Sequence, residues 1–266
     1  METDLVLPDF KNPPLEEVVV GVQFSAPPNY SILHASEIWD LFKSDYPVVS
    51  EQPRLQPQFE VFGGNPQPNL QFSFGPPPTR GKLWFVSEDG THLFQFQEDR
   101  LLLNWRRRGL ENTYPRHEKL IAIFSNYLEK LDKFYKAKYS AALSVNQAEV
   151  SYINALPVSD FSEAGDWIKF FGSSELKIEL LSATLTEIVQ NIEGKPIARM
   201  SYEILPVWEQ LTEQKAIRLS LTSRGKPDGE STHSALAFIA NMREKIVQRF
   251  CDLTTEKAHK IWGRQT

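Results

Sequence analysis

The sequence predicts an α+β protein built from two tandem β-α-β-β-β-α-like modules, in which each antiparallel sheet is packed by one long helix. Three observations lead to this prediction. Short runs of alternating apolar residues recur between turn-forming residues, which is typical of antiparallel strands. Two long stretches instead have apolar residues at helical spacing, and one of them falls late in each half of the chain. The order of these patterns is the same in both halves although the residues differ, and a single merged sheet is the alternative arrangement.

The first half opens with a predicted strand over residues 16–24. Four apolar residues alternate along it and share one face: Val18, Val20, Val22 and Phe24. Pro27 and Pro28 end this strand, and residues 31–44 then have the spacing of a helix that ends before Pro47. We therefore expect a strand followed by an amphipathic helix.

Residues 48–81 are rich in proline, which disfavours long regular elements. We expect long loops here, with short edge strands at 59–62 and 70–74 only. Aromatic-rich runs separated by turn-forming residues then follow at 82–86, 92–97 and 101–106. These runs predict an antiparallel meander, whose register across the turns the sequence leaves open.

A long helix is predicted to begin near Thr113 and Pro115 and to continue to about residue 136. Its apolar residues recur three or four positions apart: Leu120, Ile123, Phe124, Tyr127, Leu131 and Phe134. The stretch 138–147 is small and polar and has no periodicity. We therefore place the boundary there, between an N-terminal α+β module, residues 1–140, and a C-terminal α+β module, residues 141–266.

The second half predicts the same order of elements. We expect a short helix or turn region at 161–171, a long helix at 231–250, and strands at 147–155, 176–190, 196–207 and 216–222. The turn at 191–194 joins two of these strands as a hairpin. A final helical turn, capped by Thr254 or Thr255 and ended by Gly263, is expected to bury three apolar residues: Ala258, Ile261 and Trp262.

The composition indicates a folded protein and disfavours several functional classes. Hydrophobic residues make up 41% and charged residues 24%, as in globular proteins. The formal net charge of -5 disfavours general nucleic-acid binding, which depends on Lys and Arg at phosphates, although a local basic patch stays open. The first ten residues lack the basic start and apolar run of a secretory signal, and no stretch has the roughly 18 apolar residues of a membrane span. We therefore expect a cytoplasmic location and no membrane partner.

The sequence contains none of the common motifs for a cofactor, a metal or a catalytic nucleophile. It has no phosphate-binding or dinucleotide-binding glycine loop, no nucleophile elbow and no His-Glu-x-x-His motif. The five histidines are scattered singly, without metal-binding spacing on one helix. His117 is expected to be solvated in the first turn of its helix, and Cys251, the only cysteine, is interpreted as a small core residue. We expect no cofactor.

Two terminal stretches carry a resemblance to a known family. They are residues 12–24, Asn-Pro-Pro-Leu-Glu-Glu-Val-Val-Val-Gly-Val-Gln-Phe, and residues 250–262, Phe-Cys-Asp-Leu-Thr-Thr-Glu-Lys-Ala-His-Lys-Ile-Trp. Together they resemble a sporadically distributed family of uncharacterised bacterial proteins of about this length. The resemblance implies a bacterial origin, its patchy distribution hints at defence or toxin–antitoxin systems, and it implies no activity or catalytic residue. Physically, Glu17 is expected to pair with a basic residue and Trp262 to fill the core.

One group of residues has the composition of a nucleic-acid or anion contact. Its members are all basic or tryptophan and lie on two predicted strands and their ends: Arg80, Lys82, Trp84, Trp105, Arg106, Arg107 and Arg108. Guanidinium groups and aromatic faces together hold phosphates and stack bases. The sequence favours the other interpretation, a strand end whose tryptophan lies in the core and whose arginines are solvated or paired with carboxylates.

Two functions from different classes fit these observations. The sequence favours a noncatalytic protein-binding component, which holds an unidentified partner protein by shape and strand addition beside the proline-rich loops. The more specific form of this hypothesis is an antitoxin-like protein or a part of a bacterial defence system. The alternative is a hydrolase or nucleic-acid-processing enzyme with a site around residues 105–108. Its expected anchors are Arg106, Arg108 and His117, and their clustering with a carboxylate in a deep pocket would favour the enzyme.

Overall fold

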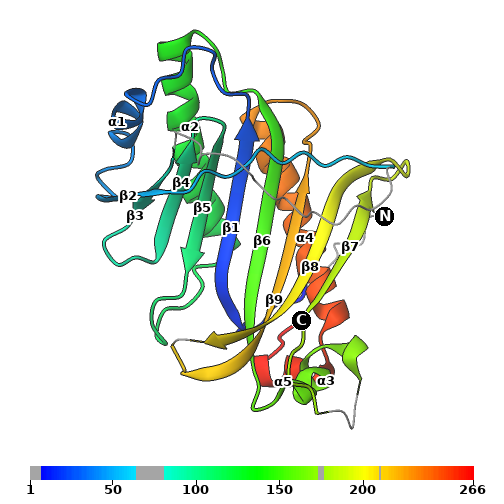
Figure 1. The fold of residues 1–266 in the computed structure, drawn as a ribbon. Coiled ribbons are helices and arrows are strands. Elements are labelled where there is room, and N and C mark those ends of the chain that lie inside the picture. The colour runs from blue at the N-terminus through cyan, green and yellow to red at the C-terminus, as the bar shows by residue number, and fades with distance from the viewer. Residues whose placement is uncertain (1–6, 64–80, 173–176, 210) are drawn as a thin grey trace.

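The protein is organised around one antiparallel sheet (Figure 1). The computed structural model describes residues 7–63, 81–172, 177–209 and 211–266. Within these ranges nine strands pair in the order β2-β3-β4-β5-β1-β6-β9-β8-β7. Their bounds are β1 Leu15–Phe24, β2 Val48–Gln52, β3 Lys82–Val86, β4 His92–Gln97, β5 Arg100–Arg106, β6 Val145–Pro157, β7 Ala183–Gln190, β8 Pro196–Glu209 and β9 Gln214–Gly225.

Two long helices lie on the same face of this sheet, behind it in Figure 1. Helix α2 packs against the β5 and β1 side, and helix α4 against the β6 and β9 side. The helices are α1 His34–Trp39, α2 His117–Tyr139, α3 Ala164–Trp167, α4 Thr232–Leu253 and α5 Glu256–Trp262. The two long helices together cover the middle of the sheet.

The prediction of two tandem modules with separate sheets is wrong, because β1 and β6 pair with each other at the centre. Their register places Val18 opposite Tyr152, Val20 opposite Val150, and Val22 opposite Ala148. If the two halves formed separate sheets, β1 and β6 would each leave one edge without backbone partners, although one face of each strand is apolar. Pairing these two edges satisfies both strands and merges the halves into one sheet.

The core lies between the sheet and the long helices. Phe94, Leu103, Val20 and Val150 occupy one row across β4, β5, β1 and β6, and each side chain is fully buried. Alternate residues of a strand point to the same face, so the row continues every second position along each strand. Burial of one such side chain stabilises the fold by roughly 1.5–3 kcal/mol. The alternating pattern of the sequence therefore corresponds to a single shared core.

Several predicted elements differ from the structure in their extent. Residues 48–52 form the edge strand β2, which was not predicted. Residues 59–62 were predicted as a strand and form none. The predicted strand at 70–74 lies outside the described residues. Helix α1 is shorter than predicted because the chain breaks into turns after residue 39. Strand β7 begins at Ala183 and not at 176. Proline density and short apolar runs do not fix where such elements begin and end.

The C-terminal segment packs onto the start of the described chain. Trp262 is 4% exposed and contacts the ring of Phe10, which confirms its predicted place in the core, and Cys251 is buried with a free thiol. Ile261 is 55% exposed, so its predicted burial is wrong. Thr255 caps α5 by accepting the Ala258 backbone N–H. The helical turn thus buries two of its three predicted apolar residues.

A polar groove on the free face of the sheet

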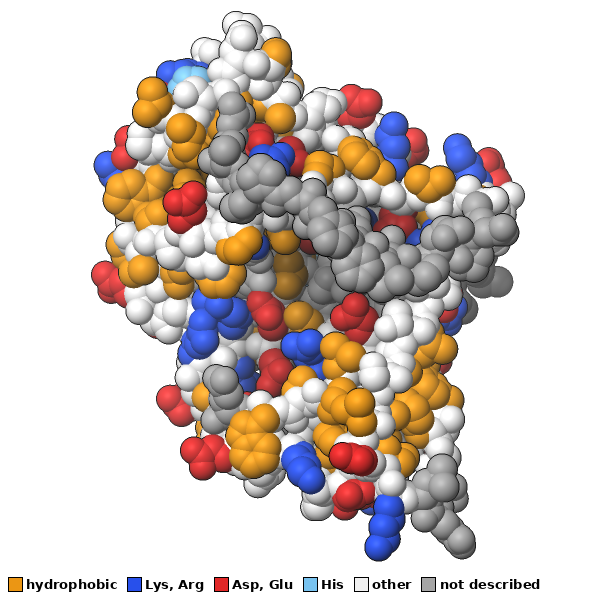
Figure 2. Space-filling view, viewed as in Figure 1, with side chains coloured by type: hydrophobic (Ala, Val, Ile, Leu, Met, Phe, Trp, Pro, Cys, Tyr) orange, Lys and Arg blue, Asp and Glu red, His pale blue; other side chains and the backbone are white. Residues whose placement is uncertain are grey.

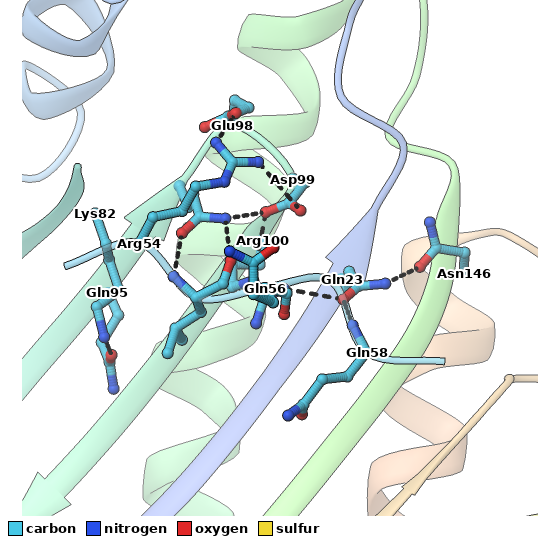
Figure 3. A network of polar contacts seen from close by, with 12 residues as sticks. Gln23, Arg54, Gln56, Gln58, Lys82, Gln95, Glu98, Asp99, Arg100 and Asn146 are labelled. Atoms are coloured by element: carbon cyan, nitrogen blue, oxygen red, sulfur yellow. Dashed lines mark hydrogen bonds and ion pairs between the residues drawn. The ribbon is translucent and has the colours of Figure 1, made fainter. Parts of the chain in front are cut away.

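The face of the sheet opposite the long helices is polar. It is crossed by residues 53–62, which we call the strap and which runs in front of the sheet in Figure 1. The strap has no strand ladder of its own, and Pro53 and Pro57 have no N–H to donate. Its backbone groups are bound instead by side chains of the strands beneath. Figure 3 shows this network.

Side-chain amides and guanidinium groups replace the missing ladder. Gln97, which is 1% exposed, accepts the Leu55 N–H at 2.9 Å and donates to the Leu55 carbonyl at 3.0 Å. Gln23 accepts the backbone N–H of Gln58 at 2.9 Å, and Arg100 donates to the Gln56 carbonyl at 2.9 Å. Buried polar groups are tolerated when they are hydrogen-bonded, so these side chains and the strap depend on each other.

Ion pairs fix both ends of the strap. Arg54 contacts Glu98 at the turn between β4 and β5. At the other end, Glu60 accepts from Arg199 of β8 at 2.7 Å. The strap therefore spans the sheet from the β4–β5 turn to β8, and links strands of both halves.

Below the strap the free face forms a groove of about 750 Å³. Leu55 of the strap contributes to its rim, and β3, β4, β5, β1, β6, β9 and β8 contribute to its lining. Figure 2 shows acidic and basic side chains gathered around a hollow in this face. The groove is open and polar, unlike an enclosed apolar pocket.

A row of hydrogen-bonded side chains crosses four strands of the groove. Lys82 donates to the Gln95 carbonyl oxygen at 2.5 Å, Gln95 donates to Asn104 at 2.8 Å, and Asn104 donates to Glu17 at 2.6 Å. Burial lowers the pKa of Lys82, and the positive charge of Arg100 lowers it further. Glu17 therefore accepts from an amide, and the basic residue opposite it in the β1–β5 register is Arg106, with whose charge it interacts.

Trp84 and Arg106 stack beside this row. The Arg106 guanidinium lies over the Trp84 ring at 5.6 Å, within the range of a cation–π contact. Burial lowers the pKa of Arg106, and the charge of Arg108 adds to this effect. The Arg106 Nε atom is buried and has no hydrogen-bond partner among the described residues. Arg106 thus presents an unused donor in the groove.

The other half of the groove carries a second set of charges and an apolar rim. Arg218, Glu203 and Ser220 line it from β9 and β8. Trp208 and Leu211 stand at its end with 62% and 39% of their surface exposed. Exposed aromatic and aliphatic side chains at the edge of a polar groove provide contact area for a partner.

The predicted nucleic-acid or anion contacts are only partly brought together. Lys82 and Arg106 line the groove, and Trp84 stacks on Arg106 beside it. Arg107 and Arg108 also line it, but Arg107 turns toward the Pro13 carbonyl and Arg108 donates to the Gly90 carbonyl. Trp105 points to the opposite face, where it is 2% exposed and contacts Tyr114, and Arg80 lies outside the described residues. For Trp105, the interpretation as a core residue is confirmed.

The three predicted anchors of an enzyme do not cluster. Arg106 and Arg108 line the groove, whereas His117 lines a cavity on the helix side of the sheet. His117 is 8% exposed, so the prediction that it is solvated is wrong, because residues 7–10 and α4 cover the start of α2. Within the described ranges no three His, Cys, Asp or Glu side chains are grouped to hold a metal ion.

Sequence reasoning missed Gln95, Asn104 and Glu203 of the groove. Their signal is present, since Gln95 and Gln97 alternate with buried apolar residues in β4, and Asn104 and Arg106 do so in β5. The alternation predicts a polar face for each strand. Only the register between strands, which follows from the pairing, brings these residues into one row.

No helix in the described part of the chain is long and apolar enough to cross a membrane. Models of known protein families give no match to this sequence, and curated protein sequences give none either. The family resemblance of the two terminal stretches therefore stays an expectation.

Proposed function

We propose that this protein is a noncatalytic binding protein that holds an extended segment of a partner protein in the groove. The balance of charge in the groove carries this proposal. Five acidic and five basic side chains line it: Glu16, Glu17, Glu149, Glu203, Glu209, Lys82, Arg106, Arg107, Arg108 and Arg218. A phosphate backbone needs an excess of positive charge, whereas a polypeptide with side chains of both signs matches a mixed surface.

The residue types at the ends of the groove support a protein partner. Tryptophan and arginine contribute most often to the binding energy of protein interfaces. The stacked pair of Trp84 and Arg106 lies at one end, and the exposed Trp208 lies at the other. The partner segment would place a carboxylate near Arg106 and an apolar side chain against Trp208.

The edges of the sheet offer a second mode of contact. Strand β7 is the last strand at one edge and exposes Leu185 and Ile188, at 43% and 45%. Strand β2 forms the other edge and exposes Val48 and Val49. Strand addition at either edge would extend the interface, since an edge strand has backbone groups free to pair.

The narrower role rests on the family resemblance. An antitoxin-like protein, or a component of a bacterial defence system, would use such a surface to cover a second protein of the same system. A cytoplasmic location fits this role, and the buried free thiol of Cys251 fits a reducing compartment.

The test is purification of the tagged protein from its native cell, with mass spectrometry and nucleic-acid analysis of what accompanies it. We expect one stoichiometric protein that is lost with Arg106→Gln and with Trp208→Ser. The matched control is Ile192→Ser, which removes a fully exposed apolar side chain at the β7–β8 turn. Equal capture by all three variants would contradict the proposal, and nucleic acid lost with Arg106→Gln would favour the processing enzyme.

A further inference from the structure

A separate cavity of about 330 Å³ lies on the helix side of the sheet. It is enclosed by the start of α2, the second half of α4, and residues 7–10, which pass over it. About half of its lining residues are apolar, with Phe10, Ile246 and Phe250 among them. A cavity of this size that combines apolar side chains with placed polar groups is typical of sites for small molecules.

Two nitrogen atoms in this cavity lack partners. His117 is 8% exposed, and its Nδ1 atom has no hydrogen-bond partner among the described residues. The Nε atom of Arg243 is also buried and has no partner there. No salt bridge of Arg243 is present within the described ranges; the carboxylates that line the cavity are Asp9, which pairs with Arg116, and Glu118, which is exposed. Buried donors without acceptors are costly, and a ligand that supplies an acceptor removes this cost.

The backbone at the mouth of the cavity is strained. Arg116 is not glycine, yet it has φ 74° and ψ 156° at the residue before α2. Its side chain binds Asp9 at 2.7 Å and so holds residues 7–10 over the cavity. This conformation directs the start of α2, a 23-residue helix, at the cavity, where its partial positive charge favours an anion.

We propose that this cavity binds a small organic carboxylate with an apolar body, which accepts hydrogen bonds from Arg243 and His117. The apolar walls fit the body of such a ligand. The hydroxyl groups of Tyr114 and Tyr152 share one hydrogen bond at 3.1 Å in the same cavity, which leaves one O–H as a donor for a second oxygen. Arg116 and Asp9 neutralise each other and Glu118 is exposed to solvent, so Arg243 is the cation left inside the cavity for one negative charge, and a free phosphate ion with its greater charge fits less well.

Calorimetric titration of the purified full chain tests the class of ligand. The probes are hexanoate, the neutral hexanol, the cationic hexylammonium and inorganic phosphate. We expect saturable one-to-one binding of hexanoate, and binding at least tenfold weaker for each of the other three. No binding of hexanoate at millimolar concentration, or equal or tighter binding of hexanol, hexylammonium or phosphate, would overturn the assignment.

A variant and its control locate the binding. Arg243→Gln is expected to weaken hexanoate binding by roughly tenfold or more, the loss typical of one charged hydrogen bond. Lys245→Gln removes the same charge from an exposed position of the same helix, and should leave hexanoate affinity unchanged. Circular dichroism establishes that both variants are folded. Equal affinity of Arg243→Gln and the wild type would overturn the proposed site.

The imidazole of His117 gives a readout in the unaltered protein. Burial and, to a smaller extent, the positive charge of Arg243 lower its pKa to about 4, and the carboxylate of Glu118 opposes them. A bound carboxylate favours the protonated ring, so hexanoate should raise the His117 pKa. This pKa is measured from the imidazole resonances of His117 in NMR spectra. A His117 pKa that hexanoate leaves unchanged or lowers would contradict the proposed contact.

Discussion

The contact between Gln97 and the strap gives the sharpest test of how the free face is held together. Gln97→Leu keeps the volume of the side chain but removes three hydrogen bonds, two to the Leu55 backbone and one to the Asp99 carboxylate. Each bond contributes about 0.5–1.5 kcal/mol, and the Leu55 groups are left without partners. We therefore expect the free energy of unfolding to fall by roughly 2–4 kcal/mol, measured by urea denaturation.

The control for this variant is Gln147→Leu. Gln147 lies on the same face, directly opposite Gln23 in the β1–β6 register, and is 5% exposed. Its Oε1 atom has no partner among the described residues, so its replacement should change the unfolding free energy by less than about 0.5 kcal/mol or raise it. Hydrogen exchange at the Leu55 and Gln58 amides should accelerate in Gln97→Leu alone. Equal destabilisation by the two variants, or unchanged exchange, would refute the reasoning.

Three further predictions concern the helix side of the sheet and its close contacts. The His117 pKa is lowered to about 4 in the folded protein, below its usual value of 6.5, so the unfolded chain binds the proton more tightly. The stability that neutral His117 allows should be fully present above pH 6.5 and fall toward pH 4. Denaturation across this range should show a loss on the order of 2 kcal/mol greater in the wild type than in His117→Gln. Gly225→Ala should lower the unfolding free energy by roughly 1–3 kcal/mol, because its Cβ would meet the Ile197 carbonyl oxygen, and a normal melting temperature would contradict this close approach. Trp105→Ala should cost roughly 3–5 kcal/mol in urea denaturation, because Trp105 is 2% exposed. Trp84→Ala should cost much less and instead weaken capture of the partner, because Trp84 is only half-buried and stacks on Arg106. The reverse result would mean that the two faces are wrongly assigned.

Local patterns predicted the elements of this protein better than their arrangement. The alternation in β1 and the helical spacing in α2 and α4 depend on neighbours in sequence, and these three elements are present. The pairing of β1 with β6 joins residues more than a hundred positions apart, and nothing in either strand marks its partner. The strap was predicted as a loop with a short edge strand at 59–62, because its contacts are made by side chains from distant strands that the local pattern does not show.

The groove was predicted in part for the same reason. Lys82, Trp84 and Arg106 stand out as basic and aromatic residues close together in sequence, and their two strands are both next to β4. Glu17 and Glu203 come from strands that are distant in sequence from these two, and their negative charges make the groove balanced in charge and not basic. The cavity near His117 depends on α4 and residues 7–10, so the first turn of α2 alone gave the wrong exposure.

The central pairing of β1 and β6 has a consequence for any attempt to divide the protein. A cut between residues 140 and 141 falls in the connection between α2 and β6. Each fragment would then carry a strand with one apolar face at its open edge, where identical fragments associate into aggregates. The same edges recognise each other, so the fragments should be recovered in folded form only when they are produced together, as a noncovalent complex.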